Sequence, residues 1–236
     1  MSTGKRIAIE YFSDVLCVWA YGAQIRLDQL KRDFSDQVQV MHRFLPVFAA
    51  TAERIQREWE AHGGYAGYNK HVRQIASTWS HVEVHPRIWL ENVPASSMPA
   101  HLFLKAVQLI EQRAQLGKTA QTGKEATNAF EAAAWRVRQA FFKEARDVAH
   151  QVVLERIAQA LELPVRQVWE LIESGEAHAA LHLDFDARDR YHIPGSPTLV
   201  LNEGRQRLYG NVGYRVIEAN VHELLRDPRS GEATWC

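Results

Sequence analysis

The stretch FSDVLCVWAYG, residues 12–22, decides the fold because it predicts a strand that runs directly into a helix. Before it, Ile7, Ile9 and Tyr11 follow one another at a period of two and so lie on one face, which is typical of a β-strand. After it, apolar side chains recur at the spacing of a helix. Cys17 stands at the junction, and the residue three positions later is Ala20, so the expected helix begins with a single thiol.

The rest of the chain continues this strand-and-helix pattern. Residues 38–48 have a second strand-like pattern, which Pro46 ends. Helical spacing recurs in five stretches, with start and stop signals such as the Gly63-Gly64 pair at several of their ends: residues 51–64, 99–117, 128–147, 148–164 and 165–176. Residues 198–210 contain two short strands around a tight turn and predict a hairpin. Residues 214–227 predict a final helix, which Pro228 follows.

Together these segments predict an α/β fold with one mixed sheet and a large inserted helical subdomain. A strand, a helix and a strand in this order place the first two strands parallel to each other. The N-terminal and C-terminal pieces are each too small to bury a core alone, so we expect them to share the sheet. The predicted sheet domain comprises residues 1–48 and 195–236, and the helical subdomain comprises residues 49–194.

The composition excludes several classes of function. The 236 residues are 46% hydrophobic and 24% charged, as in ordinary globular proteins. Lys plus Arg equals Asp plus Glu at 28 each, which gives no electrostatic basis for binding nucleic acid or an anionic membrane. Residues 1–12 lack the apolar run of a signal peptide, and no stretch is long enough to cross a bilayer. We therefore expect a cytoplasmic protein, and no cysteine or histidine motif predicts a metal site.

Three segments of the chain resemble one known family. They are YFSDVLCVWAYG, FFKEARDVAHQVVLERIAQALEL and IPGSPTLVLNEGRQRLYGNVG. Over nearly its whole length the chain resembles the DsbA family of thioredoxin-fold proteins, and in particular FrnE-like cytosolic oxidoreductases. Its first segment is also similar to kappa-class glutathione transferases and 2-hydroxychromene-2-carboxylate isomerases, which carry serine where this chain has Cys17. The resemblance implies a thioredoxin-like sheet, but FrnE-like proteins have a second cysteine where this chain has Ala20, so no dithiol mechanism is implied.

Cys17 is the candidate catalytic residue. A thiol at a helix N-terminus lies near unpaired N–H groups and the positive end of the helix dipole, and both stabilise a thiolate. We therefore predict that the pKa of Cys17 is lowered. In one interpretation, Cys17 attacks a disulfide and an outside thiol releases the product. In a second, Cys17 donates a hydrogen bond to a bound glutathione thiolate, the role that the resemblance gives to serine. In a third, the thiol is inert and the protein is a thioredoxin-like binding module.

The favoured interpretation is a DsbA-family thiol–disulfide oxidoreductase that uses one thiol. It implies glutathione as a co-substrate, or a small thiol or disulfide substrate, with no tightly bound cofactor. The chain has a second cysteine, Cys236, at its last position, and nothing in the sequence directs it toward Cys17. The sequence does not identify the substrate, and it leaves a homodimer open.

The resemblance also implies a second half of the site, around the turn HIPGSP. Pro197 matches the cis-proline that faces the active cysteine in thioredoxin-like proteins. A bend at this position leaves the backbone N–H and C=O groups of Ser196 available to an extended peptide or to glutathione. We therefore predict Ser196 and Pro197 as binding residues.

Five further residues complete the predicted binding set. The loop before the last helix contains Asn211, Gly213 and Arg215, and N–H groups at a helix N-terminus bind anions. In the glutathione-binding interpretation, this loop holds a carboxylate of glutathione. The remaining two residues, Ser13 and Trp19, lie on either side of the thiol in the sequence.

Overall fold

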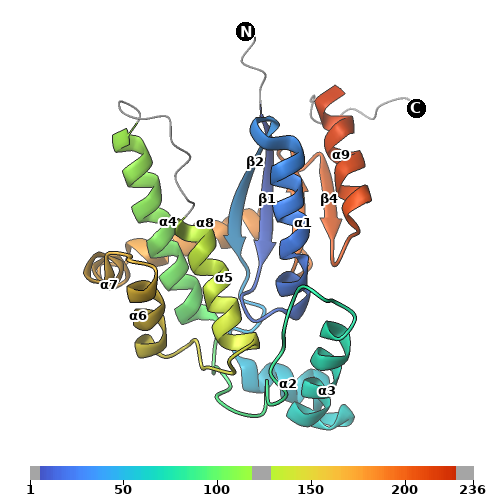
Figure 1. Cartoon of the computed structure of the whole chain (residues 1–236), viewed down its shortest axis with the longest axis vertical. Helices are drawn as coiled ribbons and strands as arrows, with labels where there is room; N and C mark the ends of the chain where they lie inside the picture. Colours follow the sequence, from blue (N-terminus) through green and yellow to red (C-terminus); the bar gives the residue numbers. More distant parts are fainter. Residues whose placement is uncertain (1–5, 119–128, 227–236) are drawn as a thin grey trace. The chain divides into compact units, whose positions relative to one another are not determined.

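The computed structural model describes residues 6–118 and 129–226, whose helices and strands are labelled in Figure 1. The N-terminal part contains β1 (Ile7–Ser13), α1 (Val18–Phe34), a short 3-10 turn (Ser35–Gln37) and β2 (Val38–Phe44). The helical part contains α2 (Thr51–Trp59), a second 3-10 turn (Glu60–His62), α3 (Gly64–Ala76), α4 (Met98–Lys118), α5 (Ala129–Phe142), α6 (Gln151–Ala160), α7 (Val165–Glu173) and α8 (Glu176–Arg190). The C-terminal part contains β3 (Thr198–Leu201), β4 (Gln206–Tyr209) and α9 (Tyr214–Arg226).

Within the described residues, the strands form one mixed sheet in the order β2-β1-β3-β4. β1 pairs in parallel with β2, from Ile7 opposite Val38 to Ser13 opposite Phe44. β1 also pairs antiparallel with β3, and β3 pairs antiparallel with β4. The prediction that the C-terminal hairpin shares a sheet with the first strand is therefore confirmed, as is the α/β fold class.

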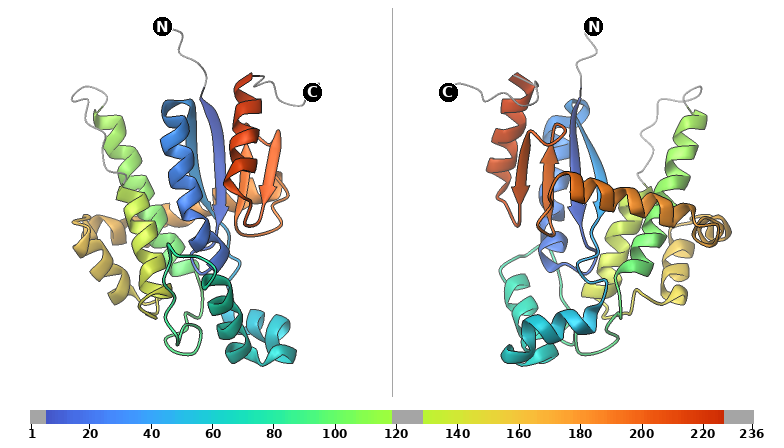
Figure 2. Two further views of the ribbon diagram at one scale, coloured as in Figure 1. Left: turned by 45° about the vertical axis from the view of Figure 1, so that its right-hand side comes forward. Right: turned by 180° about the vertical axis from the view of Figure 1, so that it is seen from behind.

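Both faces of the central strands are buried. On one face, Ile9 packs in a cluster with Leu27 of α1 and Val221 of α9, and Figures 1 and 2 show these two helices on the same side of the sheet. On the other face, Phe12 packs in a second cluster with Ala187, near the end of α8. All four residues of β3, TLVL, are buried. A strand that is covered on both faces has a nearly continuous apolar sequence, because neither set of alternating side chains faces solvent.

The chain divides into two compact units. Among the described residues, one unit comprises residues 6–47 and 184–226 and holds the sheet, and the other comprises residues 48–118 and 129–183. The boundary predicted from the sequence lies between residues 194 and 195, whereas in the structure the sheet unit already includes the end of α8, from Asp184 onward. The reason is packing: the Asp184 carboxylate accepts a hydrogen bond from the backbone N–H of Phe44 at 2.8 Å, and Ala187 belongs to the second cluster of the sheet.

The helical unit has a core of its own, built on aromatic side chains. Trp89 is fully buried, and its ring centre lies 5.0 Å from that of Phe48 and 4.9 Å from that of Phe141. Asn69 of α3 donates a hydrogen bond to the backbone carbonyl of Ile88 at 2.6 Å, which ties down the segment between α3 and α4. The inserted helices therefore form a packed unit and not an extended appendage.

Two features typical of other protein classes are absent from residues 6–118 and 129–226. None of the described helices combines the length and the apolar character needed to span a membrane. Nor do three or more His, Cys, Asp or Glu side chains in these ranges converge on a point where a metal ion could bind. The feature of chemical interest is the junction around Cys17.

Candidate active site

Asp14 organises the turn between β1 and α1. Its carboxylate accepts a hydrogen bond from the backbone N–H of Leu16 at 2.8 Å, and its backbone carbonyl accepts one from the N–H of Cys17 at 3.2 Å. An aspartate that bonds the backbone two residues later is a common way of closing a turn. Cys17 follows as the N-cap of α1, with extended backbone angles, and its carbonyl accepts the N–H of Tyr21 at 3.0 Å. The thiol therefore lies at the start of the helix, where the sequence predicts it.

The thiol of Cys17 faces the turn that precedes β3. Its Sγ–H donates a hydrogen bond to the backbone carbonyl of Ser196 at 3.3 Å, across a separation of 179 residues in the chain. The hydroxyl of Ser196 accepts a hydrogen bond from the backbone N–H of Asp14 at 2.9 Å. The peptide bond between Ser196 and Pro197 is cis, as the family resemblance implied. The two halves of the predicted site are thus adjacent.

Burial raises the pKa of the Cys17 thiol, so the predicted lowering is wrong. The residue is only 7% exposed, and the loss of hydration disfavours the thiolate. Burial has the largest effect on this pKa, and the charge of Asp14 raises it further. Hydrogen bonds from the Ser196 side chain and from the backbone of Ala20 and Trp19 act in the opposite direction and lower it. The sequence indicates a helix N-terminus, whereas the depth at which its first residue is buried depends on the tertiary fold.

The two predicted binding residues nearest the thiol in the sequence, Trp19 and Ser13, differ in solvent exposure. Trp19 is the second residue of α1 and is 37% exposed, so part of its side chain faces solvent. Ser13 is fully buried at the end of β1, and its carbonyl accepts the N–H of Leu45 at 3.0 Å. The prediction of Ser13 as a binding residue is corrected accordingly, because a side chain inside the sheet unit offers no surface to a ligand.

The three residues predicted before the last helix lie at the start of α9. The carbonyl of Gly213 accepts the N–H of Val216 at 3.1 Å and so belongs to the first turn. Arg215 is exposed, whereas Asn211 is half-buried. The cation that contacts Asn211 is Arg26 of α1, whose guanidinium donates a hydrogen bond to the side-chain oxygen of Asn211. Arg26 is not among the binding residues predicted from the sequence.

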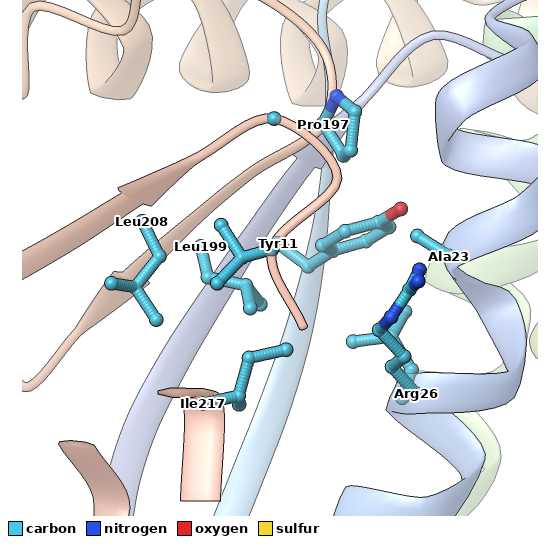
Figure 3. Close-up of a pocket in the computed structure, with 10 residues that line it drawn as sticks. Tyr11, Ala23, Arg26, Pro197, Leu199, Leu208 and Ile217 are labelled. Carbon is cyan, nitrogen blue, oxygen red and sulfur yellow. The ribbon is translucent and has the colours of Figure 1, made fainter. Parts of the chain in front are cut away.

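A pocket lies beside the cis-proline, within the sheet unit (Figure 3). Its empty volume is about 280 Å³, including space open to solvent. Figure 3 shows the ring of Tyr11 below Pro197, with its hydroxyl directed toward α1, and that hydroxyl donates a hydrogen bond to the carbonyl of Ala20 at 3.5 Å. The other lining residues come from α1, β3, β4, the loop after β4, and α9: Ala23, Arg26, Leu27, Leu199, Leu208, Gly210, Val212 and Ile217.

Arg26 gives this pocket its electrostatic character. Among the described residues that line the pocket, it alone carries a charge. Partial burial lowers the pKa of its guanidinium, an effect that Tyr11 opposes. One signal in the sequence marks it, because a basic residue stands between Ala23 and Leu27 on the apolar face of α1.

Tyr209 is a second residue that the sequence analysis missed. It lies at the end of β4, is 59% exposed, and its ring covers Gly195, next to Ser196. A Cβ atom on Gly195 would lie 3.1 Å from the Tyr209 hydroxyl oxygen, so only glycine allows this close approach without movement of the ring. The turn beside the thiol is thus flanked by an exposed aromatic side chain.

Solved structures share this architecture over nearly the whole chain. A candidate protein disulfide isomerase from Nitrosomonas europaea is 18% identical, with a TM-score of 0.72, and the match covers 94% of this chain and 98% of that one. A 2-hydroxychromene-2-carboxylate isomerase is 14% identical, with a TM-score of 0.63 and coverages of 94% and 97%. The cytosolic disulfide reductase DsbM from Pseudomonas aeruginosa, solved with GSH, is 18% identical, with a TM-score of 0.62 and coverages of 93% and 99%. At such identities the likeness shows the fold alone.

The family is shown by the sequence itself. No curated protein matches the chain. The model of the DSBA-like thioredoxin domain matches residues 8–221, from β1 through the Cys17 junction and the helical unit into α9. The chain therefore belongs to the family of DSBA-like thioredoxin domains.

Proposed function

We propose that this protein is a thiol–disulfide oxidoreductase in which Cys17 acts alone and glutathione is the co-substrate. The observation that carries the proposal is the position of the Cys17 sulfur. It lies at the N-cap of α1, 3.3 Å from the carbonyl of Ser196, the residue before cis-Pro197. Ala20 occupies the position one turn later, and Cys236 lies outside the described residues, so the mechanism is built on one thiol.

The surroundings of the thiol support the binding of an extended ligand. Within the described ranges, the backbone N–H of Ser196 has no hydrogen-bond acceptor, so it is available to a peptide group of a ligand. Trp19 and Tyr209 are 37% and 59% exposed, and exposed aromatic rings provide rigid apolar contact surfaces. A glutathione-sized disulfide is a suitable ligand for such a surface. A cycle that consumes reduced glutathione also requires a reducing compartment such as the cytoplasm.

The raised pKa favours the reductive direction. Strongly oxidising members of the thioredoxin superfamily stabilise their reduced, thiolate form, whereas burial of Cys17 disfavours the thiolate. A thiol of higher pKa is the stronger nucleophile once ionised and the poorer leaving group. The raised pKa also lowers the fraction of Cys17 that is thiolate, so we expect slow attack on a disulfide and a mixed disulfide that persists until a second thiol cleaves it.

The proposed cycle has three exchanges. The Cys17 thiolate, its proton lost to solvent, attacks a substrate disulfide, which forms a mixed disulfide and releases one substrate thiolate that takes up a proton. A glutathione thiolate attacks the Cys17 sulfur, which releases the second substrate thiol and leaves glutathione on Cys17. A second glutathione thiolate attacks the glutathione sulfur, which releases oxidised glutathione and regenerates Cys17. In sum, one disulfide and two glutathione molecules give two thiols and one oxidised glutathione.

Mass spectrometry of the protein treated with oxidised glutathione tests this proposal. We expect one glutathionyl group on Cys17, slow to be removed by reduced glutathione because Cys17 is a poor leaving group. Cys17→Ser should abolish the modification at this site, and Cys236→Ser should leave it intact. A Cys17 that stays unmodified in the folded protein but reacts in urea would refute the proposal.

A second candidate function is a glutathione-dependent transferase or isomerase. The observation that favours it is the hydrogen bond from the neutral Cys17 thiol, because an S–H donor can also stabilise a bound glutathione thiolate. In that case glutathione binds without modifying Cys17, and Cys17→Ser remains active because a hydroxyl is also a donor. The same mass spectrum, together with the activity of Cys17→Ser, distinguishes the two functions.

A further inference from the structure

The pocket of Figure 3 contains a guanidinium that no described carboxylate neutralises. Arg26 is half-buried, and its partner is the side-chain oxygen of Asn211, a neutral acceptor. The arginines that pair with carboxylates elsewhere in the sheet unit provide the contrast, since Arg43 binds both Glu10 and Asp184. A partly desolvated cation among apolar side chains is stabilised by an anion, and the described residues supply none at Arg26.

The pocket and the thiol site share the turn before β3. Pro197 lines the pocket, and the carbonyl of Ser196, one residue earlier, accepts the hydrogen bond from Cys17. Next to Pro197, the Tyr11 hydroxyl donates a hydrogen bond to the carbonyl of Ala20, one turn after Cys17. A ligand whose sulfur meets Cys17 can therefore extend past the cis-proline into this pocket.

The separation of Cys17 and Arg26 along the axis of α1 is comparable to the length of a short peptide. Arg26 follows Cys17 by nine residues in the same helix, about 13 Å along its axis. Helical side chains tilt toward the helix N-terminus, and Figure 3 shows the Arg26 side chain directed toward Ala23, which shortens that distance. An extended tripeptide spans roughly 10 Å, the same order as this axial separation, so a ligand of that size is long enough to contact the pocket from the turn beside the thiol.

We propose that Arg26, together with Asn211, binds a carboxylate of the thiol or disulfide co-substrate in this pocket. The planar guanidinium matches a carboxylate with two parallel hydrogen bonds. The amide N–H₂ of Asn211, whose oxygen faces Arg26, is a further donor to the same anion. Arg26 replaces Arg215 as the proposed cation of the site, because an exposed arginine is screened by solvent. The proposal rests on the proposed function only for the contact between the ligand sulfur and Cys17.

Binding of S-methylglutathione, which cannot exchange disulfides, tests the pocket apart from the chemistry. Calorimetric titration should show that the unaltered protein binds S-methylglutathione. Arg26→Gln should weaken this binding roughly ten- to one-hundred-fold, because a charged hydrogen-bonding partner is lost, and Arg26→Lys should weaken it less. Arg32→Gln, an exposed arginine on the same helix, is the matched control and should leave the affinity unchanged. The diethyl ester of S-methylglutathione should bind the unaltered protein as weakly as the acid binds Arg26→Gln.

The ester comparison needs no variant, so it decides the question even if Arg26→Gln does not fold. Three results would each overturn the proposal: equal affinity of the protein for the acid and the ester, equal affinity of the folded Arg26→Gln variant and the unaltered protein for the acid, or no binding of S-methylglutathione. The proposed function fails separately: if Cys17 never forms a mixed disulfide but acid binding still depends on Arg26, the pocket stands without the oxidoreductase activity. If Cys17 reacts with oxidised glutathione but Arg26→Gln changes neither affinity nor rate, the pocket fails and the activity stands.

Discussion

Replacing Ser196 with alanine tests the link between the two halves of the site. In the native turn, the Ser196 hydroxyl accepts the backbone N–H of Asp14 at 2.9 Å, in a partly buried position. A buried donor left without its acceptor costs about 1–3 kcal/mol. Because the position is only partly buried, we expect Ser196→Ala to lose about 1–2 kcal/mol of unfolding free energy. For a chain of this length, that corresponds to a fall in melting temperature of about 2–8 °C.

The same substitution has a second effect, on the thiol. The Ser196 side chain lowers the pKa of Cys17 and partly offsets the effect of burial, so Ser196→Ala should raise that pKa further. The rate of alkylation by iodoacetamide depends on the thiolate. The pH profile of that rate, followed by mass spectrometry of the Cys17 peptide, should therefore move to higher pH.

The matched control is Ser77→Ala. Its exposed hydroxyl donates a hydrogen bond to the carbonyl of Gln74 at 2.8 Å, on the surface of the helical unit. We expect a change in stability within about 0.5 kcal/mol and no change in the alkylation profile. If the profile of Ser196→Ala stays in place or moves to lower pH, the assignment of Ser196 as the group that favours the Cys17 thiolate is refuted.

Three further substitutions follow from the structure. Folding raises the pKa of Cys17, so the neutral thiol stabilises the folded state at pH values below the ordinary thiol pKa of about 8.5. This contribution is lost as the pH rises through the pKa of the folded state. The difference in unfolding free energy between the native chain and Cys17→Ala, measured in urea, should therefore fall with rising pH. Ala20→Cys adds a thiol one turn after Cys17, where side chains are neighbours, and should give an intramolecular disulfide and insulin reductase activity. Asp184→Ala removes the acceptor for the Phe44 N–H and a partner of Arg43, and should lower the unfolding free energy by about 2–4 kcal/mol.

Each of these has an outcome that contradicts it. A stability difference for Cys17→Ala that does not vary with pH would mean that the folded and unfolded pKa values are equal. Failure of Ala20→Cys to lose both thiols under mild oxidant would show that the start of α1 does not bring the two sulfurs together. For Asp184→Ala the control is Asp189→Ala, an exposed carboxylate near the end of α8, and equal urea midpoints for the two variants would rule out a structural role for Asp184.

The fold was largely predictable because its deciding signals are local. The alternation in β1, the spacing in α1 and the turn between β3 and β4 lie within short windows of sequence. The helices α3 and α8 were not among the five predicted helical stretches. α3 begins at Gly64, in a Gly-Gly pair that was interpreted as a stop, and α8 carries acidic and basic residues around its circumference, including the buried Asp184. Both are stabilised by tertiary packing, which overrides weak local signals.

For the active site, the sequence identified the thiol and its partner turn but not their environment. Cys17 and Ser196 were recognisable from the junction and from the family resemblance, and they are in contact. The sign of the pKa shift depends on how deeply α1 begins within the sheet unit, and no local pattern encodes that depth. Arg26 was visible as a charge on an apolar face, yet only the fold shows that it meets Asn211 from a distant loop.

The separation of 179 residues between Cys17 and Ser196 has a consequence for biosynthesis. At about 5–20 residues per second, a ribosome needs roughly ten to forty seconds to pass from one to the other. During that interval the nascent thiol has no carbonyl partner and no burial, so its pKa is that of an ordinary cysteine and a larger fraction of it is thiolate than in the finished protein. Cys17 is therefore more readily oxidised while the chain is still being made, and completion of the sheet by β3 brings the Ser196 carbonyl to the thiol and lowers its thiolate fraction.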